Sequence, residues 1–252
     1  MKRTLLALCC LLYAVASLAQ SADTLMGEKH VAALGTPKLS CGYDHGITLR
    51  QCVAPASLYV SGAIISAVPA MHLNINVPLR DWTQRDGHER FEIENGIQYI
   101  PIAAPLLLKA CGLESRHGWR DLICLEAGTV LVTTLLGNSL KYGIATERPY
   151  GGVFNSFPSG HTYTAFMGAE ILRREYGEEY PGIAIAGYTV ATGVGLMRIY
   201  NSRHWMADVL AGAGIGILST SAAYWTYPTL NRWATHHGCR LTATATTLTL
   251  HW

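Results

Sequence analysis

Arg198, His204 and Asp208 form the first group of residues in this 252-residue chain whose types and spacing suit catalysis. His204 and Asp208 are four residues apart, just before a long apolar run, so they are expected to share one face of a helix. Asp208 can then accept a hydrogen bond from one ring nitrogen of His204, and the other nitrogen keeps a lone pair that can act as a nucleophile. Taken alone, the segment is also explained by a capping aspartate beside a surface histidine.

Pro158, Ser159, Gly160 and His161 form a second group, directly before another apolar run. A helix N-terminus offers unpaired backbone N–H groups and a partial positive charge, and Gly160 would let an anion approach that backbone closely. Ser159 adds a hydroxyl donor. His161 has an ordinary pKa near neutral, which suits a general acid that protonates a leaving oxygen. A helix cap with an incidental histidine is the alternative.

Lys141 and Arg148 form the third group, at the end of one apolar run and in the loop after it. A membrane-surface lysine and an ordinary loop arginine would also explain these two residues in isolation. The three groups together point to phosphate, because a phosphomonoester carries a charge of about −2 and its transition state needs several fixed cations. Transfer through a phosphohistidine would divide the hydrolysis into two easier steps. The sequence contains no acidic cluster or C-x-x-C spacing that would indicate a metal site, and we expect no cofactor.

These three groups resemble the motifs of the type 2 phosphatidic acid phosphatase (PAP2) superfamily, K-x6-RP, PSGH and SR-x5-H-x3-D, over about residues 95–230. The resemblance implies His204 as nucleophile, His161 as general acid and Asp208 as the residue that orients His204. It implies a phosphate site made by the residues already described, namely Lys141, Arg148, Ser159, Gly160 and Arg198. Met197 replaces the serine expected before Arg198, which we expect to tune the activity rather than abolish it.

The surroundings of His204 are most similar to bacterial envelope lipid phosphatases of that superfamily, such as lipid A phosphatases. The resemblance therefore implies a metal-independent phosphatase whose partners are a phosphorylated lipid and a membrane. Undecaprenyl pyrophosphate phosphatases, phosphatidylglycerophosphate phosphatases and exported non-specific acid phosphatases remain alternatives. A vanadium-dependent haloperoxidase, which holds vanadate on the histidine that corresponds to His204, is the alternative from a different class.

The composition agrees with a membrane protein or an unusually buried one. Charged residues make up 14% of the chain, below the roughly 25% of soluble domains, and apolar residues make up 50%. The net charge of +2 and the scattered Lys and Arg residues argue against a nucleic-acid surface.

The sequence divides into four parts: a signal peptide (1–19), an irregular lead-in (20–52), a helical catalytic domain (53–232) and a C-terminal tail (233–252). An uncleaved N-terminal anchor is the alternative to the signal peptide. Either one exports the chain to an oxidising compartment, where Cys41 and Cys52 are hypothesised to form a disulfide. The tail alternates Thr with Leu or Ala, which is consistent with either a strand or a frayed segment.

Six apolar segments predict an all-α, six-helix bundle that is embedded in or associated with a membrane. Only the first and last segments are expected to be long enough to span comfortably. The segments are Val53–Met71, Ile97–Leu108, Leu122–Leu140, His161–Leu172, Gly182–Met197 and Val209–Asn231.

If all six segments cross a membrane, the three groups of candidate residues fall on one face. The distribution of Lys and Arg favours a periplasmic location for that face in a bacterial envelope. That orientation requires the residues before Val53 to be cytoplasmic, whereas cleavage of the signal would leave them outside. A bundle in which some helices do not span is the alternative.

Overall fold

The computed structural model describes residues 49–84, 92–236, 240–243 and 248–251. The expected signal peptide, most of the lead-in and Cys41 lie outside these residues. Residues 55–252 form one unit, and the description below refers to it. Each of the six apolar segments overlaps one helix along most of its length, which confirms the predicted all-α six-helix architecture. These helices are α2 (Leu49–Ala67), α6 (Ile100–Ala110), α7 (Trp119–Ile144), α8 (Gly160–Tyr176), α9 (Pro181–Tyr200) and α10 (Met206–His236).

Short elements complete the described part of the chain. They are α3 (Pro69–Met71), the π-helical turn η1 (His72–Asn76), α4 (Val77–Gln84), α5 (Glu94–Ile97), and the strands β1 (Arg240–Ala243) and β2 (Leu248–His251). The chain bends by 93° between α2 and the segment that begins with α3. The two strands pair in antiparallel fashion, so the tail contains a strand pair in addition to the predicted helices.

Local sequence explains where the helices that carry the candidate site begin and end. Helix α8 begins at Gly160, directly after Ser159, whose extended backbone occupies the N-cap position. Helix α9 begins at Pro181, which suits a first turn because its missing N–H would be unpaired there. Helix α7 ends where Ala145 adopts a left-handed conformation with a φ of 49°. The end of α7 and the start of α8 thereby border the loop that holds Arg148 and Ser159.

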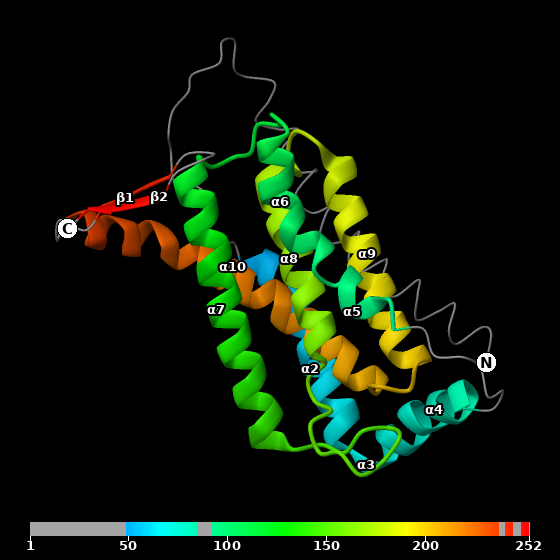
Figure 1. Cartoon of the computed structure of the whole chain (residues 1–252). Coiled ribbons are helices and arrows are strands. Elements are labelled where there is room, and N and C mark those ends of the chain that lie inside the picture. Colours follow the sequence, from blue (N-terminus) through cyan, green and yellow to red (C-terminus); the bar gives the residue numbers. More distant parts are fainter. Residues whose placement is uncertain (1–48, 85–91, 237–239, 244–247, 252) are drawn as a thin grey trace. The chain divides into compact units, whose positions relative to one another are not determined.

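Helix α8 occupies the middle of this unit. Figure 1 shows α6, α7, α9 and α10 around it, and all four pack against it. Its residues from Ala165 to Leu172 are buried without interruption. A helix that is buried on every side is a core helix, which accounts for its apolar segment being too short for a comfortable membrane span.

Two glycines of α10 allow that helix to lie very close to α8. A Cβ atom on Gly212 would lie 2.8 Å from the backbone oxygen of Ser159, and one on Gly216 would lie 2.5 Å from that of Tyr163. The two glycines are four residues apart and share one helix face, as in small-xxx-small packing. This contact holds the N-terminal end of α8 against the first turns of α10.

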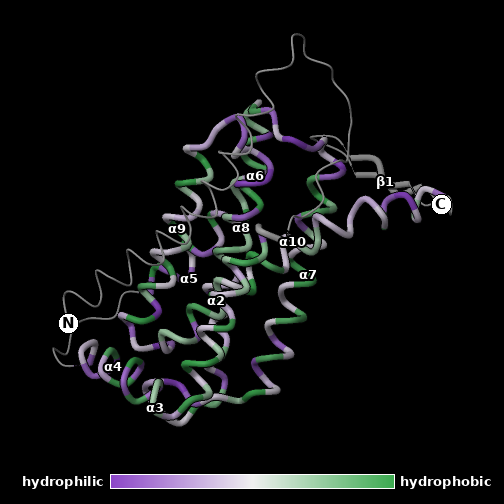
Figure 2. Tube along the Cα trace, turned by 180° about the vertical axis from the view of Figure 1, so that it is seen from behind, coloured by the Kyte–Doolittle hydropathy of each residue, from purple (hydrophilic) through white to green (hydrophobic). Residues whose placement is uncertain are grey.

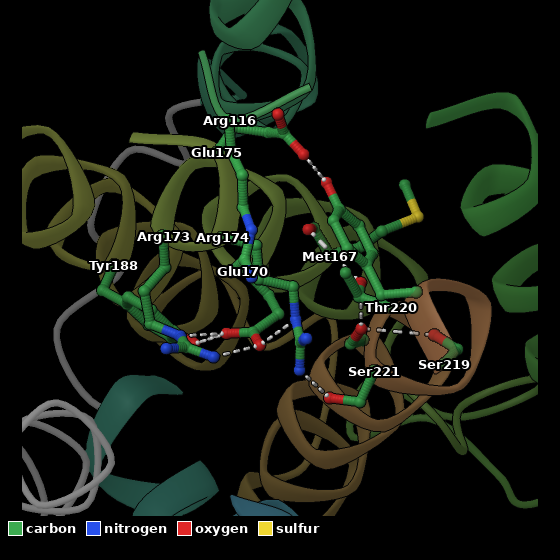
Figure 3. Close-up of polar contacts among 12 residues, drawn as sticks. Arg116, Met167, Glu170, Arg173, Arg174, Glu175, Tyr188, Ser219, Thr220 and Ser221 are labelled. Atoms are coloured by element: carbon green, nitrogen blue, oxygen red, sulfur yellow. Dashed lines mark hydrogen bonds and ion pairs between the residues drawn. The ribbon is translucent and has the colours of Figure 1, made fainter. Parts of the chain in front are cut away.

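The second half of α8 contains a buried ion-pair cluster (Figure 3). The Glu170 side chain is 2% exposed and accepts hydrogen bonds from Arg173 and Arg174 at 2.7 Å each. The Tyr188 hydroxyl donates to the same carboxylate at 2.6 Å, and Arg174 also donates to Ser221 Oγ at 2.9 Å. Buried charges are tolerated when they are paired, and this pairing explains how a core helix carries Glu170, Arg173 and Arg174.

Helices α7, α9 and α10 are each long and apolar enough to cross a membrane, and α2 passes only together with the bent segment after it. Figure 2 shows hydrophobic residues along α7 and α9, and Leu131 and Leu135 of α7 are about three-fifths exposed. The expectation that only the first and last segments are long enough was wrong. Helix α7 runs for 26 residues and α9 for 20, both beyond their apolar segments, and the first segment is interrupted by a bend.

Gly216→Ala is expected to destabilise the protein by about 1–3 kcal/mol, because the added methyl group would overlap the backbone of α8. Gly193→Ala in α9 is the matched control, since nothing lies within 4 Å of its Cβ position, and it should be neutral or stabilising. Thermal unfolding of both variants in the same detergent measures the difference. Equal transition temperatures would contradict the close packing of α8 on α10.

Candidate active site

The three groups of candidate residues meet at one end of the helices. Lys141 comes from the last turn of α7, and its Nζ donates a hydrogen bond to the backbone oxygen of Pro158 at 2.8 Å. The backbone N–H of Ser159 donates to the backbone oxygen of Asp208 at 3.0 Å. The structure thus joins the first group to the second and the second to the third.

Asp208 lies in the first turn of α10, and its side chain is fully buried. Its Oδ2 atom accepts hydrogen bonds from Ser156 Oγ at 2.5 Å and from the backbone N–H of Trp205 at 2.8 Å. The same oxygen lies 3.5 Å from Nδ1 of His204, which is longer than a normal hydrogen bond. Asp208 therefore faces the expected ring, while its short contacts are to the two segments beside that ring.

Lys141 and Arg148 are arranged around Asn155. Lys141 Nζ donates to the backbone oxygen of Asn155 at 2.9 Å, and Arg148 Nε donates to its side-chain Oδ1 at 2.7 Å. The loop between α7 and α8 therefore folds back on the helix end that precedes it. One asparagine fixes both cations.

Arg198 comes from the last turn of α9 and is 5% exposed. Its Nη1 donates to Oε1 of Glu94 at 3.1 Å, and Asn201 Nδ2 donates to the same oxygen at 2.8 Å. The Nε atom of Arg198 is buried and has no hydrogen-bond partner among the described residues. This N–H group is available to an anion.

His161 lies in the first turn of α8, where its Nε2 donates to Oδ1 of Asn95 at 2.7 Å. Ser159 is fully buried, and its hydroxyl accepts a hydrogen bond from Thr162 Oγ1 at 2.9 Å. Gly160 follows Ser159 as the first residue of the helix. The backbone N–H groups of this helix start lie beside the histidine, as the sequence predicts.

Burial lowers the pKa of His204 well below its ordinary value, and the charges of Lys141, Arg198 and Arg148 lower it further. Burial and then the Arg198 charge lower the pKa of His161 to about 3. Both rings are therefore neutral near pH 7 when no anion is bound. A bound dianion would reverse the effect of the cations and raise both pKa values.

The arrangement can bind a tetrahedral oxyanion and transfer its central atom. Three cations, a buried serine and a helix N-terminus converge, which is the environment that stabilises charge on the equatorial oxygens of a phosphoryl group. His161 and His204, both neutral when no anion is bound, lie among these groups. Among the described residues, no three His, Cys, Asp or Glu side chains group as ligands for a metal.

Four contributors to the site were not identified from the sequence: Glu94, Asn95, Asn155 and Ser156. Asn155 and Ser156 directly precede the Pro-Ser-Gly-His segment, so their position next to a motif was the available signal. Glu94 and Asn95 lie far away in the chain. The available signal there was a polar Glu-Asn pair just before an apolar segment. Such a pair does not indicate which residues it will contact.

The chain is similar in sequence to known phosphatases. Residues 122–232 match the sequence model of the PAP2 superfamily. A lipid A 1-phosphatase of Porphyromonas gingivalis is 38% identical over 152 residues, which cover 60% of this chain and 34% of that protein. A lipid A 1-phosphatase of Helicobacter pylori is 32% identical over 106 residues, which cover 38% of this chain and 53% of that protein. The chain thus spans about a third to a half of these relatives.

The crystal structure of Aquifex aeolicus LpxE also resembles this chain. The two share 24% sequence identity with a TM-score of 0.46, and the match covers 59% of this chain and 93% of that one. The match to the family includes Lys141, His161, His204 and Asp208, whereas Glu94 and Asn95 precede it.

Sulfate is expected to bind more tightly as the pH falls from about 8 to about 5. Sulfate remains a dianion over this range, so the protons taken up on binding must come to the protein, where the anion raises the lowered pKa values of His161 and His204. Calorimetric titration at several pH values measures the dissociation constant. The double variant His161→Gln, His204→Gln should lose most of the dependence, and a pH-independent affinity in the unmodified protein would contradict these shifts.

Proposed function

We propose that this chain, whose residues 122–232 match the PAP2 superfamily, is a phosphatase that removes a phosphate monoester from an envelope lipid through a phosphohistidine. The observation that carries the proposal is the convergence of two neutral histidines and three cations at one end of the helices, with Asp208 buried beside His204. The names of the similar proteins support the reaction type and a lipid substrate.

In the first step, Nε2 of His204 attacks phosphorus, because Nδ1 is the nitrogen that faces Asp208. The bond between phosphorus and the ester oxygen breaks, and His161 donates its proton to that oxygen. The substrate dianion supplies the negative charge that allows His161 to be protonated in the complex. Asp208 stabilises the positive charge that develops on the His204 ring.

In the second step, water attacks phosphorus and the bond between phosphorus and Nε2 breaks. His161, now neutral, accepts a proton from the water, and inorganic phosphate leaves. Lys141, Arg148 and Arg198 offset the charge on the phosphoryl oxygens in both steps, together with Ser159 and the N–H groups at Gly160.

A membrane lipid is the substrate class that best fits the rest of the chain. Helices α7, α9 and α10 are candidate spans, and Leu131, Leu135 and Phe154 are each about three-fifths exposed. Lipid A is the specific substrate we favour, since both relatives described above are lipid A 1-phosphatases. Undecaprenyl pyrophosphate and phosphatidylglycerophosphate offer the same terminal phosphate chemistry. Phosphatase relatives favour hydrolysis over the haloperoxidase alternative.

The active site is proposed to face the periplasm of an exported, membrane-embedded protein. Lys109, Arg116 and Arg120 lie at or near the helix ends opposite to the site, as the positive-inside tendency requires. Arg173 and Arg174 contribute less to this tendency than their number suggests, because both are paired with Glu170. Accessibility of a cysteine placed at Phe154 to a membrane-impermeant reagent in intact cells tests the orientation.

His204→Ala is expected to abolish phosphate release, and His161→Ala is expected to slow it by at least about 10²-fold, the usual contribution of a general acid. His236→Ala, at the exposed end of α10, is the matched control and should retain full activity. Release of phosphate from lipid A in detergent micelles, with a chelator present, measures all three. Unmodified rates in both site variants would disprove the mechanism.

The substrate is tested separately with a panel of lipid A, undecaprenyl pyrophosphate, phosphatidylglycerophosphate and a soluble aryl phosphate. We expect the highest kcat/KM on lipid A. Equal values on the aryl phosphate would indicate a non-specific acid phosphatase, and halide oxidation on addition of vanadate would indicate a haloperoxidase.

A further inference from the structure

Helix α5 (Glu94–Ile97) contacts two groups of the proposed active site through consecutive residues. Glu94 binds Arg198, and Asn95 binds His161. The helix lies outside residues 122–232, which match the superfamily. It is therefore a part of the site that the three motifs do not describe.

Glu94 is fully buried, and its Oε1 accepts from both Arg198 Nη1 and Asn201 Nδ2. A carboxylate held by two donors on different segments has a fixed orientation, and it fixes the guanidinium in turn. With Nη1 engaged, the free N–H of Arg198 Nε is held in one direction. Glu94 also offsets one of the positive charges of the unliganded site.

Asn95 contacts the ring of His161. Its Oδ1 atom accepts the Nε2–H of His161 at 2.7 Å, which selects the tautomer in which Nδ1 carries the lone pair. When the ring becomes protonated, Nε2–H stays with Asn95 and the new proton is on Nδ1. That nitrogen is then the one that exchanges a proton with substrate.

We propose that Glu94 and Asn95 are positioning residues of the phosphate site, Glu94 for the guanidinium of Arg198 and Asn95 for the ring of His161. The expected effect of these residues on turnover rests on the proposed function. Their expected effect on anion binding is independent of it. Sulfate and inorganic phosphate therefore serve as probes, so that failure of the phosphatase assignment and failure of this inference give different results.

Two conservative variants separate position from charge at Glu94. Glu94→Gln keeps an oxygen within reach of both donors and removes the charge, whereas Glu94→Asp keeps the charge but is too short to reach both. A positioning role predicts that Glu94→Asp weakens phosphate binding at least about tenfold and that Glu94→Gln changes it less than about threefold. Glu92→Gln is the matched control, because Glu92 is an exposed carboxylate of the same segment that pairs with Arg203.

Asn95 is exposed, so its variants are expected to fold. They are expected to change the pH dependence of sulfate binding. His161 is faced by Arg198 on α9, His204 before α10, Arg148 in the loop and Lys141 on α7, all of which disfavour its protonation. Asn95→Asp adds the opposite charge and should move the pH midpoint of sulfate binding upward by about one unit. Asn95→Leu removes the acceptor and should move it downward. The alkaline limb of kcat should shift in the same directions.

Calorimetric titration with phosphate and sulfate at several pH values measures the dissociation constants that test the roles of Glu94 and Asn95. Tight binding by Glu94→Asp together with weak binding by Glu94→Gln would show that only the charge matters, and wild-type binding by both would also overturn the role of Glu94. Midpoints that coincide in Asn95→Asp, Asn95→Leu and the unmodified protein would overturn the role of Asn95.

Discussion

The buried carboxylate of Asp208 connects the segments on which the site depends. Its side chain accepts from Ser156 and from the Trp205 backbone, it faces the His204 ring, and its own backbone oxygen accepts the N–H of Ser159. Oδ2 of this buried carboxylate is held by two donors, so the loop before α8 and the start of α10 can adopt few other arrangements. The close approach of α8 and α10 at Gly212 makes these contacts possible.

Positive charge is the second constraint. Lys141, Arg148 and Arg198 are gathered in a partly desolvated site, and among the described contacts only Arg198 has a carboxylate partner. Asn155 orients the other two cations through neutral oxygens, which leaves their charge largely uncompensated. The resulting field depresses the pKa of both histidines until an anion arrives. In the proposed mechanism, substrate binding and protonation of His161 are thereby linked.

Sequence patterns predicted the six helices and the meeting of three distant groups of residues, because both follow from local signals: apolar segments, prolines at helix starts, and donors at helix ends. Glu94 and Asn95 were not predictable, since a tertiary contact with α8 and α9 gives them their role. The expected hydrogen bond between Asp208 and His204 is replaced by a longer contact of 3.5 Å. Helix spacing places two residues on one face but does not decide which donors a carboxylate prefers.

The steric course at phosphorus tests the central claim most directly. A phosphate ester made chiral with three oxygen isotopes, transferred by the protein to an acceptor alcohol, reports the number of displacements at phosphorus. Two in-line steps through His204 predict net retention of configuration. Net inversion would mean that the acceptor attacks the substrate directly, and it would contradict a phosphohistidine intermediate.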